Sequence, residues 1–261
     1  MKPGHKVRLK DVDTNARGAY KAKDDTRERL ETLLKRRDAL QERLYAEGKQ
    51  SLLIVFQAMD TGGKDGAIKR LLEGLNPAGI RVASFKAPSR TEMAHDFLWR
   101  IHAETPEKGF IGVWNRSHYE DVLIARVHEL VPEKVWRARY RQINDFEEML
   151  AETGTTVVKF YLHISPDEQK NRLEARLADP DKHWKFNVAD LAERKLWDNY
   201  QAAYEDAINE CSTEFAPWNI VPANHKWARD IAIAERVNAV LETMNPHYPE
   251  IKFDPETVIV E

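Results

Sequence analysis

Short apolar runs recur along the chain at intervals that suit a parallel β-sheet. The first run, Ser51–Gln57, is followed by others at 80–85, 109–114, 155–164 and 218–221. Runs that are apolar at nearly every position, rather than at every second one, are typical of strands covered on both faces. We therefore expect these five segments to form one buried parallel sheet.

The segments between these runs show the apolar spacing of amphipathic helices. In 25–48, leucines recur at steps of three, four and seven, and Gly48 is a suitable helix stop. The alternation of strands and helices predicts an α/β fold with three α/β/α layers, formed by a single domain over residues 1–261. The predicted helices occupy 25–48, 64–75, 90–103, 117–129, 132–152, 165–179, 188–210 and 225–243.

Two segments stand apart from this predicted core. Residues 165–195 form a helical hairpin around the polar turn Asp179–His183, and we expect this hairpin to act as a lid. Residues 1–23 carry seven basic and two acidic side chains, so this arm has a charge of +5. The arm is interpreted either as a solvated tail or as a segment that meets an anionic ligand.

Composition narrows the class of protein. A hydrophobic fraction of 42% excludes general disorder, and no run reaches the ~18 apolar residues of a membrane helix. The N-terminal segment lacks the apolar stretch of a secretory signal, and the single Cys211 cannot form an internal disulfide, so we expect a cytoplasmic location. The formal charge of −3 would argue against a polyanion partner, but this sum hides the basic arm.

A glycine-rich loop, Ala58–Gly66, directly follows the first predicted strand and precedes a predicted helix. This context is that of a P-loop. Gly62 and Gly63 let the backbone direct its N–H groups toward phosphate oxygens, and the start of the helix adds its positive end. Lys64 supplies a mobile positive charge for the transferred phosphoryl group.

The loop departs from the usual P-loop pattern at two positions. Ala58 stands in place of the first glycine, and Asp65 stands in place of the serine or threonine that binds magnesium. Carboxylates near phosphates are costly unless a cation lies between them, so we expect Asp60 and Asp65 to face a metal ion. The alternative is a tight turn in which an aspartate caps the helix.

A second polar cluster, Trp114–Asp121, follows the third predicted strand. Because ligands of α/β folds bind beyond the carboxyl ends of the strands, we expect this cluster to share a crevice with the glycine-rich loop. Arg116 would stabilise charge on the transferring group, and Glu120 or Asp121 would join the metal shell or position the acceptor. Alternatively, Ser117 and Glu120 form the capping box of the next helix.

The predicted lid is rich in charged residues, with seven basic and five acidic side chains between positions 170 and 195. Arg172 and Arg176 are four positions apart and therefore share a helix face. Lys182 and Lys185 flank Trp184, which would hold the turn against the domain. A solvated helix face is the ordinary explanation for such a run, whereas a basic hinged segment beside a phosphate loop is typical of a closing lid.

No other catalytic arrangement stands out in the sequence. The histidines show no zinc-binding spacing with cysteines, and no combination of serine, histidine and aspartate points to a nucleophile. Covalent catalysis is also unnecessary, because phosphoryl transfer depends mainly on positioning and electrostatics.

Six motifs, taken together and in order, resemble those of the polyphosphate kinase 2 family. That family has a P-loop kinase fold similar to thymidylate kinase, and the resemblance covers residues 10–245 of this chain. The motifs are Ala58–Gly66, Lys86–Glu92, Phe97–Arg100, Asn115–Tyr119, Asp179–Phe186 and Ala216–Trp218.

The resemblance implies Mg²⁺-dependent transfer of phosphate between inorganic polyphosphate and a nucleotide, with Mn²⁺ as an alternative metal. The second motif cluster resembles the branch that phosphorylates nucleoside monophosphates and also diphosphates. AMP and ADP are therefore the expected nucleotides, with guanine nucleotides as further candidates. The resemblance also implies a homodimer or homotetramer, and neither a nucleic acid nor a membrane is an expected partner.

The family's functional residues map onto this chain position by position. The expected catalytic residues are Asp60, Lys64, Arg116 and Arg172, with Arg116 in the Walker B motif. Many members have an aspartate metal ligand where this chain has Asn115, so the expected metal ligands are Asp60, Asp65 and Asp121. The expected phosphate- and nucleotide-binding residues are Thr61, Gly62, Gly63, Asp65, Gly66, Arg90, Asn115, Glu120, Arg176, Lys182 and Lys185.

Two other functions remain open. An ATP-dependent nucleoside monophosphate kinase would use the same fold, although Asp65 and the basic arm argue against it. A nucleotide-binding switch without useful turnover would also use the loop, although the basic lid and the two acidic loop residues argue against it.

Overall fold

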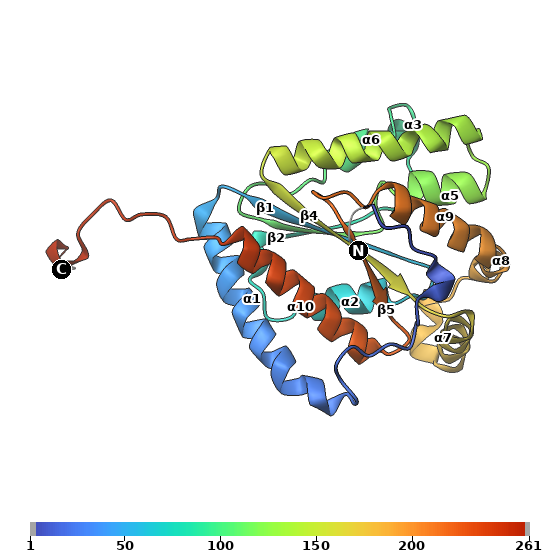
Figure 1. The fold of residues 1–261 in the computed structure, drawn as a ribbon, viewed down its shortest axis with the longest axis horizontal. Helices are drawn as coiled ribbons and strands as arrows, with labels where there is room; N and C mark the ends of the chain where they lie inside the picture. Colours follow the sequence, from blue (N-terminus) through green and yellow to red (C-terminus); the bar gives the residue numbers. More distant parts are fainter. Residues whose placement is uncertain (1–3, 259–261) are drawn as a thin grey trace.

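The computed structural model describes residues 4–258 and centres on a five-stranded sheet in the order β2-β3-β1-β4-β5 (Figure 1). Every neighbouring pair of strands is parallel, which confirms the predicted α/β fold class. The strands are β1 (Ser51–Ala58), β2 (Ile80–Ser84), β3 (Ile111–Asn115), β4 (Thr155–His163) and β5 (Trp218–Pro222).

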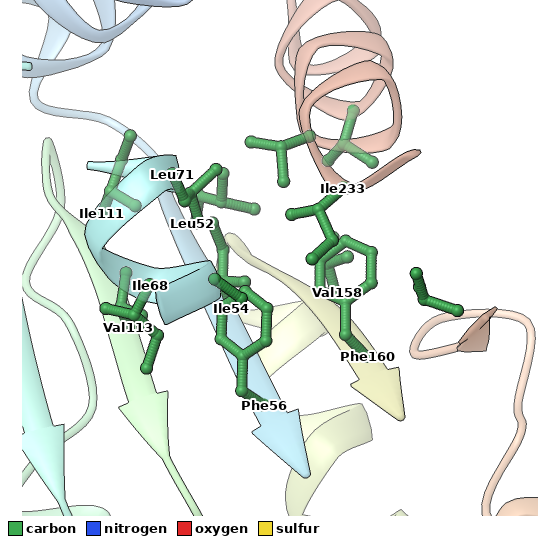
Figure 2. Close-up of a cluster of buried hydrophobic side chains, with 14 of the residues drawn as sticks. Leu52, Ile54, Phe56, Ile68, Leu71, Ile111, Val113, Val158, Phe160 and Ile233 are labelled. Atoms are coloured by element: carbon green, nitrogen blue, oxygen red, sulfur yellow. The ribbon is translucent and has the colours of Figure 1, made fainter. Parts of the chain in front are cut away.

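The central strand β1 is buried at every position because helices cover both faces of the sheet. Leu52, Ile54 and Phe56 point to one face, where α2 and α10 pack over them (Figure 2). Leu53 and Val55 point to the other face. This two-residue alternation is inherent to a strand, so a continuous apolar run supplies both hydrophobic layers.

The helices form the outer two layers (Figure 1). On the first face lie α1 (Arg27–Glu47), α2 (Lys64–Leu71) and α10 (Lys226–Met244). On the second face lie α5 (Glu120–Val127), α6 (Glu133–Glu152) and α9 (Trp197–Glu210). The remaining helices are α3 (Arg90–Met93), α4 (Trp99–His102), α7 (Pro166–Ala178) and α8 (Ala189–Lys195).

Helix α1 follows its predicted pattern closely. Leu30, Leu33, Leu40 and Leu44 are its buried leucines, and burying each contributes about 1.5–3 kcal/mol. The helix ends where Gly48 adopts a left-handed backbone conformation with φ of 61°, and its N–H donates to the Leu44 carbonyl. The predicted glycine stop is therefore confirmed.

Two predicted helices are each broken into two. The helix predicted at 90–103 is wrong, because Asp96 Oδ1 accepts a hydrogen bond from the backbone N–H of Leu98 and forms a turn between α3 and α4. The helix predicted at 188–210 breaks at Leu196 into α8 and α9. The predicted lid thus consists of α7, a 3-10 turn at Pro180–Lys185, and α8.

Much of the basic N-terminal arm is docked on the domain rather than free in solvent. Leu9 is buried, and its N–H donates to Glu205 Oε2 of α9 at 2.7 Å. The Leu9 carbonyl accepts from His163 Nε2 at 3.0 Å, and Val7 exchanges two hydrogen bonds with Asn209. The solvated-tail interpretation is therefore wrong for the backbone at Val7, Leu9 and Thr14, whereas the basic side chains of Arg8 and Lys10 are exposed. Lys2 lies outside the described residues.

Among residues 4–258, no helix has the length and apolarity needed to cross a membrane.

Candidate active site

The glycine-rich loop lies at the carboxyl end of β1, between that strand and α2. β1 is flanked by β3 and β4, so the loop occupies the position where α/β folds bind ligands. Two of its residues hold left-handed backbone conformations, Thr61 with φ of 60° and Gly63 with φ of 96°. The backbone conformation favours glycine at position 63, and a Cβ there would also force the Arg229 guanidinium to move away from the loop.

Lys64 is the first residue of α2, and its side chain turns back toward the strand. Its Nζ donates to the carbonyl oxygen of Ala58 at 3.0 Å. Burial lowers the pKa of Lys64, and the nearby Arg116 charge lowers it further, while Asp60 opposes the shift. The ammonium is therefore held among other charges at the start of the helix, next to the loop backbone.

The second cluster meets the loop through two direct contacts. Arg116 Nη2 lies 3.0 Å from Asp60 Oδ1, and Asn115 Nδ2 donates to Asp65 Oδ1 at 2.9 Å. Arg116 also has a left-handed backbone, with φ of 63°, and lies 3.7 Å from Glu120 Oε2. The expectation that both motifs share one crevice is confirmed.

These contacts shift the pKa values of Arg116 and Asp65. Burial acts to lower the pKa of Arg116, but the carboxylates of Glu120 and Asp60 outweigh it and raise that pKa. Burial acts to raise the pKa of Asp65, but the Asn115 hydrogen bond and the charges of Lys185 and Lys64 lower it overall. Both side chains are therefore charged at neutral pH.

Both helix-capping alternatives are wrong. The N-cap residue of α2 is Gly63, which has no side chain, and Asp65 is bound to Asn115 instead. Helix α5 begins at Glu120 without a side-chain cap, and Ser117 Oγ accepts from Tyr119 N and Gln57 Nε2. A capping box is present elsewhere, at the start of α3.

The lid brings Arg172 onto the loop backbone. Its Nη1 donates to the Thr61 carbonyl at 3.1 Å, and its Nε lies 2.6 Å from Glu168 Oε1. Lys185 Nζ lies 3.5 Å from Asp65 Oδ2, whereas Lys182 pairs with Asp179 within the lid turn. The lid therefore contacts the loop at two points, the Thr61 carbonyl and the Asp65 carboxylate.

A cavity of about 490 Å³ opens between the loop, the end of β3, the lid and the start of α10. Eight basic side chains line it against three carboxylates, so its lining is strongly positive. The basic residues are Lys64, Arg116, Arg172, Arg176, Lys182, Lys185, Lys226 and Arg229, and the acidic ones are Asp60, Asp65 and Asp190.

A second cavity of about 220 Å³ adjoins the first. Asp60, Arg116, Asn187 and Asp190 line both cavities, so they mark the boundary between them. The smaller cavity includes the apolar or aromatic side chains of Met59, Ile124, Tyr200 and Tyr204. Its charged lining consists of one basic side chain, Arg116, and four carboxylates, those of Asp60, Glu120, Asp190 and Glu193.

Most predicted site residues line the larger cavity, but three do not: Glu120 lines the smaller cavity, and Arg90 and Asp121 line neither. Arg90 is exposed at the start of α3. Asp121 contacts Arg139, which donates to its carbonyl at 2.8 Å, and burial raises the pKa of Asp121 to about 6. The predicted residues that line the larger cavity are Asp60, Thr61, Gly62, Gly63, Lys64, Asp65, Gly66, Asn115, Arg116, Arg172, Arg176, Lys182 and Lys185.

Four polar residues of the larger cavity were not predicted from the sequence, Asn187, Asp190, Lys226 and Arg229, and neither was the apolar Ala175. Arg229 is buried, its Nη1 donates to the Gly63 carbonyl at 3.1 Å, and its Nη2 pairs with Asp230 at 2.6 Å. One signal was available, because Lys226 and Arg229 are three apart at the start of a helix, where the helix dipole disfavours cations. Such a placement suggests that another group compensates the charge.

The three predicted metal ligands are not gathered at one point. Asp60 and Asp65 line the larger cavity, whereas Asp121 lies outside both cavities. Within residues 4–258, no group of three or more acidic, histidine or cysteine side chains is placed to hold a metal ion by itself. Any metal bound here would therefore need ligands from the substrate as well.

Comparison with known proteins identifies the family. The model of the family described as polyphosphate kinase 2 matches residues 20–249. The chain belongs to the polyphosphate kinase 2 family. It is 48% identical to an AMP/ADP-polyphosphate phosphotransferase of Meiothermus ruber, over 100% of this chain and 98% of the relative.

Other relatives of this polyphosphate kinase 2 chain agree. An ADP-polyphosphate phosphotransferase of Rhodopseudomonas palustris is 45% identical over 95% of this chain and 90% of the relative. A crystal structure of polyphosphate kinase 2 from Arthrobacter aurescens TC1 superposes with a TM-score of 0.93 at 45% identity, covering 96% of this chain and 90% of that one. The resemblance inferred from the six motifs is confirmed.

Proposed function

We propose that this chain transfers phosphate between inorganic polyphosphate and the adenine nucleotides AMP and ADP, with guanine nucleotides as further acceptors. The observation that carries the proposal is the excess of basic side chains around the phosphate loop, eight against three carboxylates. A polyanion with many adjacent charges matches such a surface better than a single phosphate group does. The named activities of the two similar relatives support the same reaction.

We assign the two substrates to the two adjoining cavities. The polyphosphate occupies the larger, basic cavity, and the nucleotide enters the smaller one, where Tyr200 and Ile124 offer an apolar surface to the nucleoside. Transfer then takes place at their boundary, beside Asp60 and Arg116. The terminal phosphate of the acceptor is already anionic at neutral pH, so no general base is needed.

The chain's own side chains supply most of the electrostatic stabilisation. Lys64 and Arg116 approach the transferring group from the loop and from β3, and Arg172 joins them from the lid. Each places positive charge where negative charge is shared between the leaving and attacking oxygens. Closure of the lid over the cavity would exclude water, which would otherwise compete as the acceptor.

The donor set of the larger cavity fits a magnesium ion, with Mn²⁺ as the alternative. Mg²⁺ is usually held by one or two carboxylates together with waters and substrate phosphates. Asp60 and Asp65 supply two carboxylates on the same cavity wall, and we assign them this role. When bound, the ion neutralises charge on the phosphates next to these carboxylates.

The direct test uses purified protein, Mg²⁺ and either AMP or ADP, with polyphosphate or ATP offered as the donor. Separation of the nucleotides by chromatography measures transfer. We expect transfer from polyphosphate in the absence of ATP. Transfer from ATP alone would indicate a nucleoside monophosphate kinase, and no transfer from either donor would indicate a nucleotide-binding switch.

Location and assembly remain predictions. The buried, unpaired Cys211 is consistent with a cytoplasmic enzyme. The predicted homodimer or homotetramer can be checked by light scattering of the full chain.

A further inference from the structure

Asn224, the second residue after β5, contacts three segments that are far apart in the sequence. These are the N-terminal arm, the first residue before lid helix α7, and the side chain of Arg172. Asn224 lines neither active-site cavity. It is therefore a candidate for a residue that acts on the site through others.

The first contact fixes the entry to the lid. The Ser165 backbone N–H donates to Asn224 Oδ1 at 3.0 Å, and Asn224 Nδ2 lies 3.2 Å from Ser165 Oγ. That hydroxyl is also the N-cap of α7, because it accepts from Glu168 N at 3.2 Å. One amide side chain thus orients the capping residue from which the lid helix starts.

The second contact joins the arm to the same point. Asn224 Nδ2 lies 3.1 Å from Thr14 Oγ1 and 3.0 Å from Asn15 Oδ1. The backbone N–H of Asn224 donates to the Thr14 carbonyl at 3.2 Å. The arm is therefore bonded at Thr14 and Asn15 to the same residue that contacts the start of α7. Further along the arm, Val7 and Leu9 attach it to α9 and β4.

The third contact leads to the active site. Arg172 Nη2 donates to the carbonyls of Ala223 at 2.5 Å and Asn224 at 3.4 Å, while its Nη1 donates to the Thr61 carbonyl of the phosphate loop. The guanidinium is thus held between the end of β5 and the loop. The position of the guanidinium depends on the carbonyls after β5, to which it donates, and on the start of α7, because Arg172 is part of that helix.

We propose that Asn224 is a positioning residue for Arg172. Its Oδ1 fixes the first turn of α7 through the Ser165 N–H, and its backbone receives the Arg172 guanidinium. The arm supports this junction from outside. The kinetic consequences rest on the proposed function, since they assume that Arg172 binds polyphosphate.

The variant Asn224→Ala removes the side-chain contacts and keeps the backbone carbonyl. We expect its kcat/KM for polyphosphate to fall about ten-fold, because small displacements of a positioned charge are costly in transfer reactions. The KM for the nucleotide should stay within about two-fold of wild type, as Asn224 lies outside the nucleotide cavity. A general loss of folded enzyme would lower kcat alone and leave both KM values in place.

Two further variants isolate the decisive contact. Asn224→Asp keeps an oxygen that accepts from Ser165 N, so it should recover most of the polyphosphate affinity lost in Asn224→Ala. The matched control is Asn219→Ala, on β5 itself, whose side chain donates to the carbonyls of Lys159 and Pro217 rather than to the arm or the lid. Equal kinetics for Asn224→Ala and Asn219→Ala, or no recovery by Asn224→Asp, would overturn the proposal.

A double-mutant cycle tests whether Asn224 acts through Arg172. In the Arg172→Ala background, Asn224→Ala should cause little further loss of kcat/KM for polyphosphate. Losses that multiply would show an independent role and contradict the proposal.

One measurement does not need the substrates. Hydrogen exchange in peptides covering 164–172 should become faster in Asn224→Ala and stay at the wild-type rate in Asn219→Ala. Unchanged exchange would overturn the junction itself. Faster exchange in an enzyme that shows no polyphosphate-dependent transfer would instead refute the proposed function and leave the junction standing.

Discussion

Two charged regions of this protein meet in the segment that follows β3, yet their charges are balanced in opposite ways. The first region is a cluster of His118, Tyr119, Glu147 and Lys159, which are all buried. Lys159 Nζ donates to Glu147, to Tyr119 Oη at 2.7 Å and to the Cys211 carbonyl at 2.7 Å. Each charge in this cluster has its partner within the fold.

The larger cavity shows the opposite balance. Its basic side chains outnumber the carboxylates by eight to three, and they face a space that is open to solvent. Arg116 belongs to the cavity, and His118, two positions later, belongs to the buried cluster. The segment after β3 is thus fixed by the paired charges around His118, while Arg116 adds to the excess of positive charge in the larger cavity.

This difference distinguishes charges that stabilise the fold from charges that are available to bind a ligand. Glu147 illustrates the first kind: burial acts to raise its pKa, but Lys159 and the His118 hydrogen bond outweigh burial and lower it. A buried pair of this kind is costly to break, whereas removing a cation from an overcrowded basic surface need not destabilise the fold. Substitutions in the two regions should therefore have different readouts.

The largest effect is expected from Lys64→Ala. We expect transfer from polyphosphate to fall by roughly 10³-fold or more, because a positive charge at the transferring group is lost. The melting temperature should remain close to wild type, since the ammonium contributes to a crowded basic site. Steady-state transfer assays and thermal unfolding measure the two quantities.

The control for this variant is Lys69→Ala, an exposed lysine on the same helix that lies outside both cavities. It should retain wild-type turnover. Turnover of Lys64→Ala close to that of Lys69→Ala would refute the site assignment.

The second effect is on stability. Glu147→Gln leaves the Lys159 ammonium buried without its carboxylate, and we expect a loss of about 3–5 kcal/mol in the free energy of unfolding. Denaturant titration measures it, with Glu148→Gln as an exposed neighbouring control on α6. If both variants were equally stable, the cluster would not be the anchor that the contacts indicate.

The third prediction concerns Arg172→Ala. The Arg172 side chain lines the cavity and also donates to backbone carbonyls, so it combines a role in binding with a role in the fold. We expect the KM for polyphosphate to rise by about ten-fold and the KM for the nucleotide to change by less than about two-fold. Lys170→Ala, an exposed lysine on the same helix, is the control. An unchanged polyphosphate dependence would remove Arg172 from the donor site.

The smallest effect is a dependence of stability on pH. Burial lowers the pKa of His118 below its ordinary 6.5, so the unfolded chain takes up a proton first as the pH falls. Stability should therefore decrease as the pH drops below about 6.5, and this slope should be shallower in His118→Gln. Denaturant titrations between pH 7 and pH 5 measure it, and the exposed His5→Gln should keep the wild-type slope.

The sheet and the phosphate loop were predictable because their signals are local. The apolar run of β1 reports burial on both faces, and Gly62, Gly63 and Lys64 act through their own backbone and side-chain chemistry. The break at Asp96 was missed because one side-chain hydrogen bond decides it. The spacing of Lys226 and Arg229 points to a compensating group but does not identify it, because the contact between Arg229 and the Gly63 carbonyl joins residues 166 positions apart.

The docking of the arm was missed for a related reason. Its sequence shows a basic segment, and composition alone suggests solvent or an anionic ligand. What fixes it is the buried side chain of Leu9, together with hydrogen bonds that join the backbone of Val7, Leu9 and Thr14 to Asn209, Glu205, His163 and Asn224. Backbone contacts of this kind do not depend on residue type, so they leave no pattern to read.

The left-handed backbone at Thr61 and Arg116 has a consequence for how this enzyme can change. A residue with a Cβ in this conformation costs roughly 1 kcal/mol more than glycine, so each position stores a small amount of conformational energy. Random variation selected only for heat resistance would be drawn toward glycine at both places. At position 116 that gain would remove the guanidinium shared by both cavities, so a more stable protein and a faster enzyme lie in different directions from this sequence.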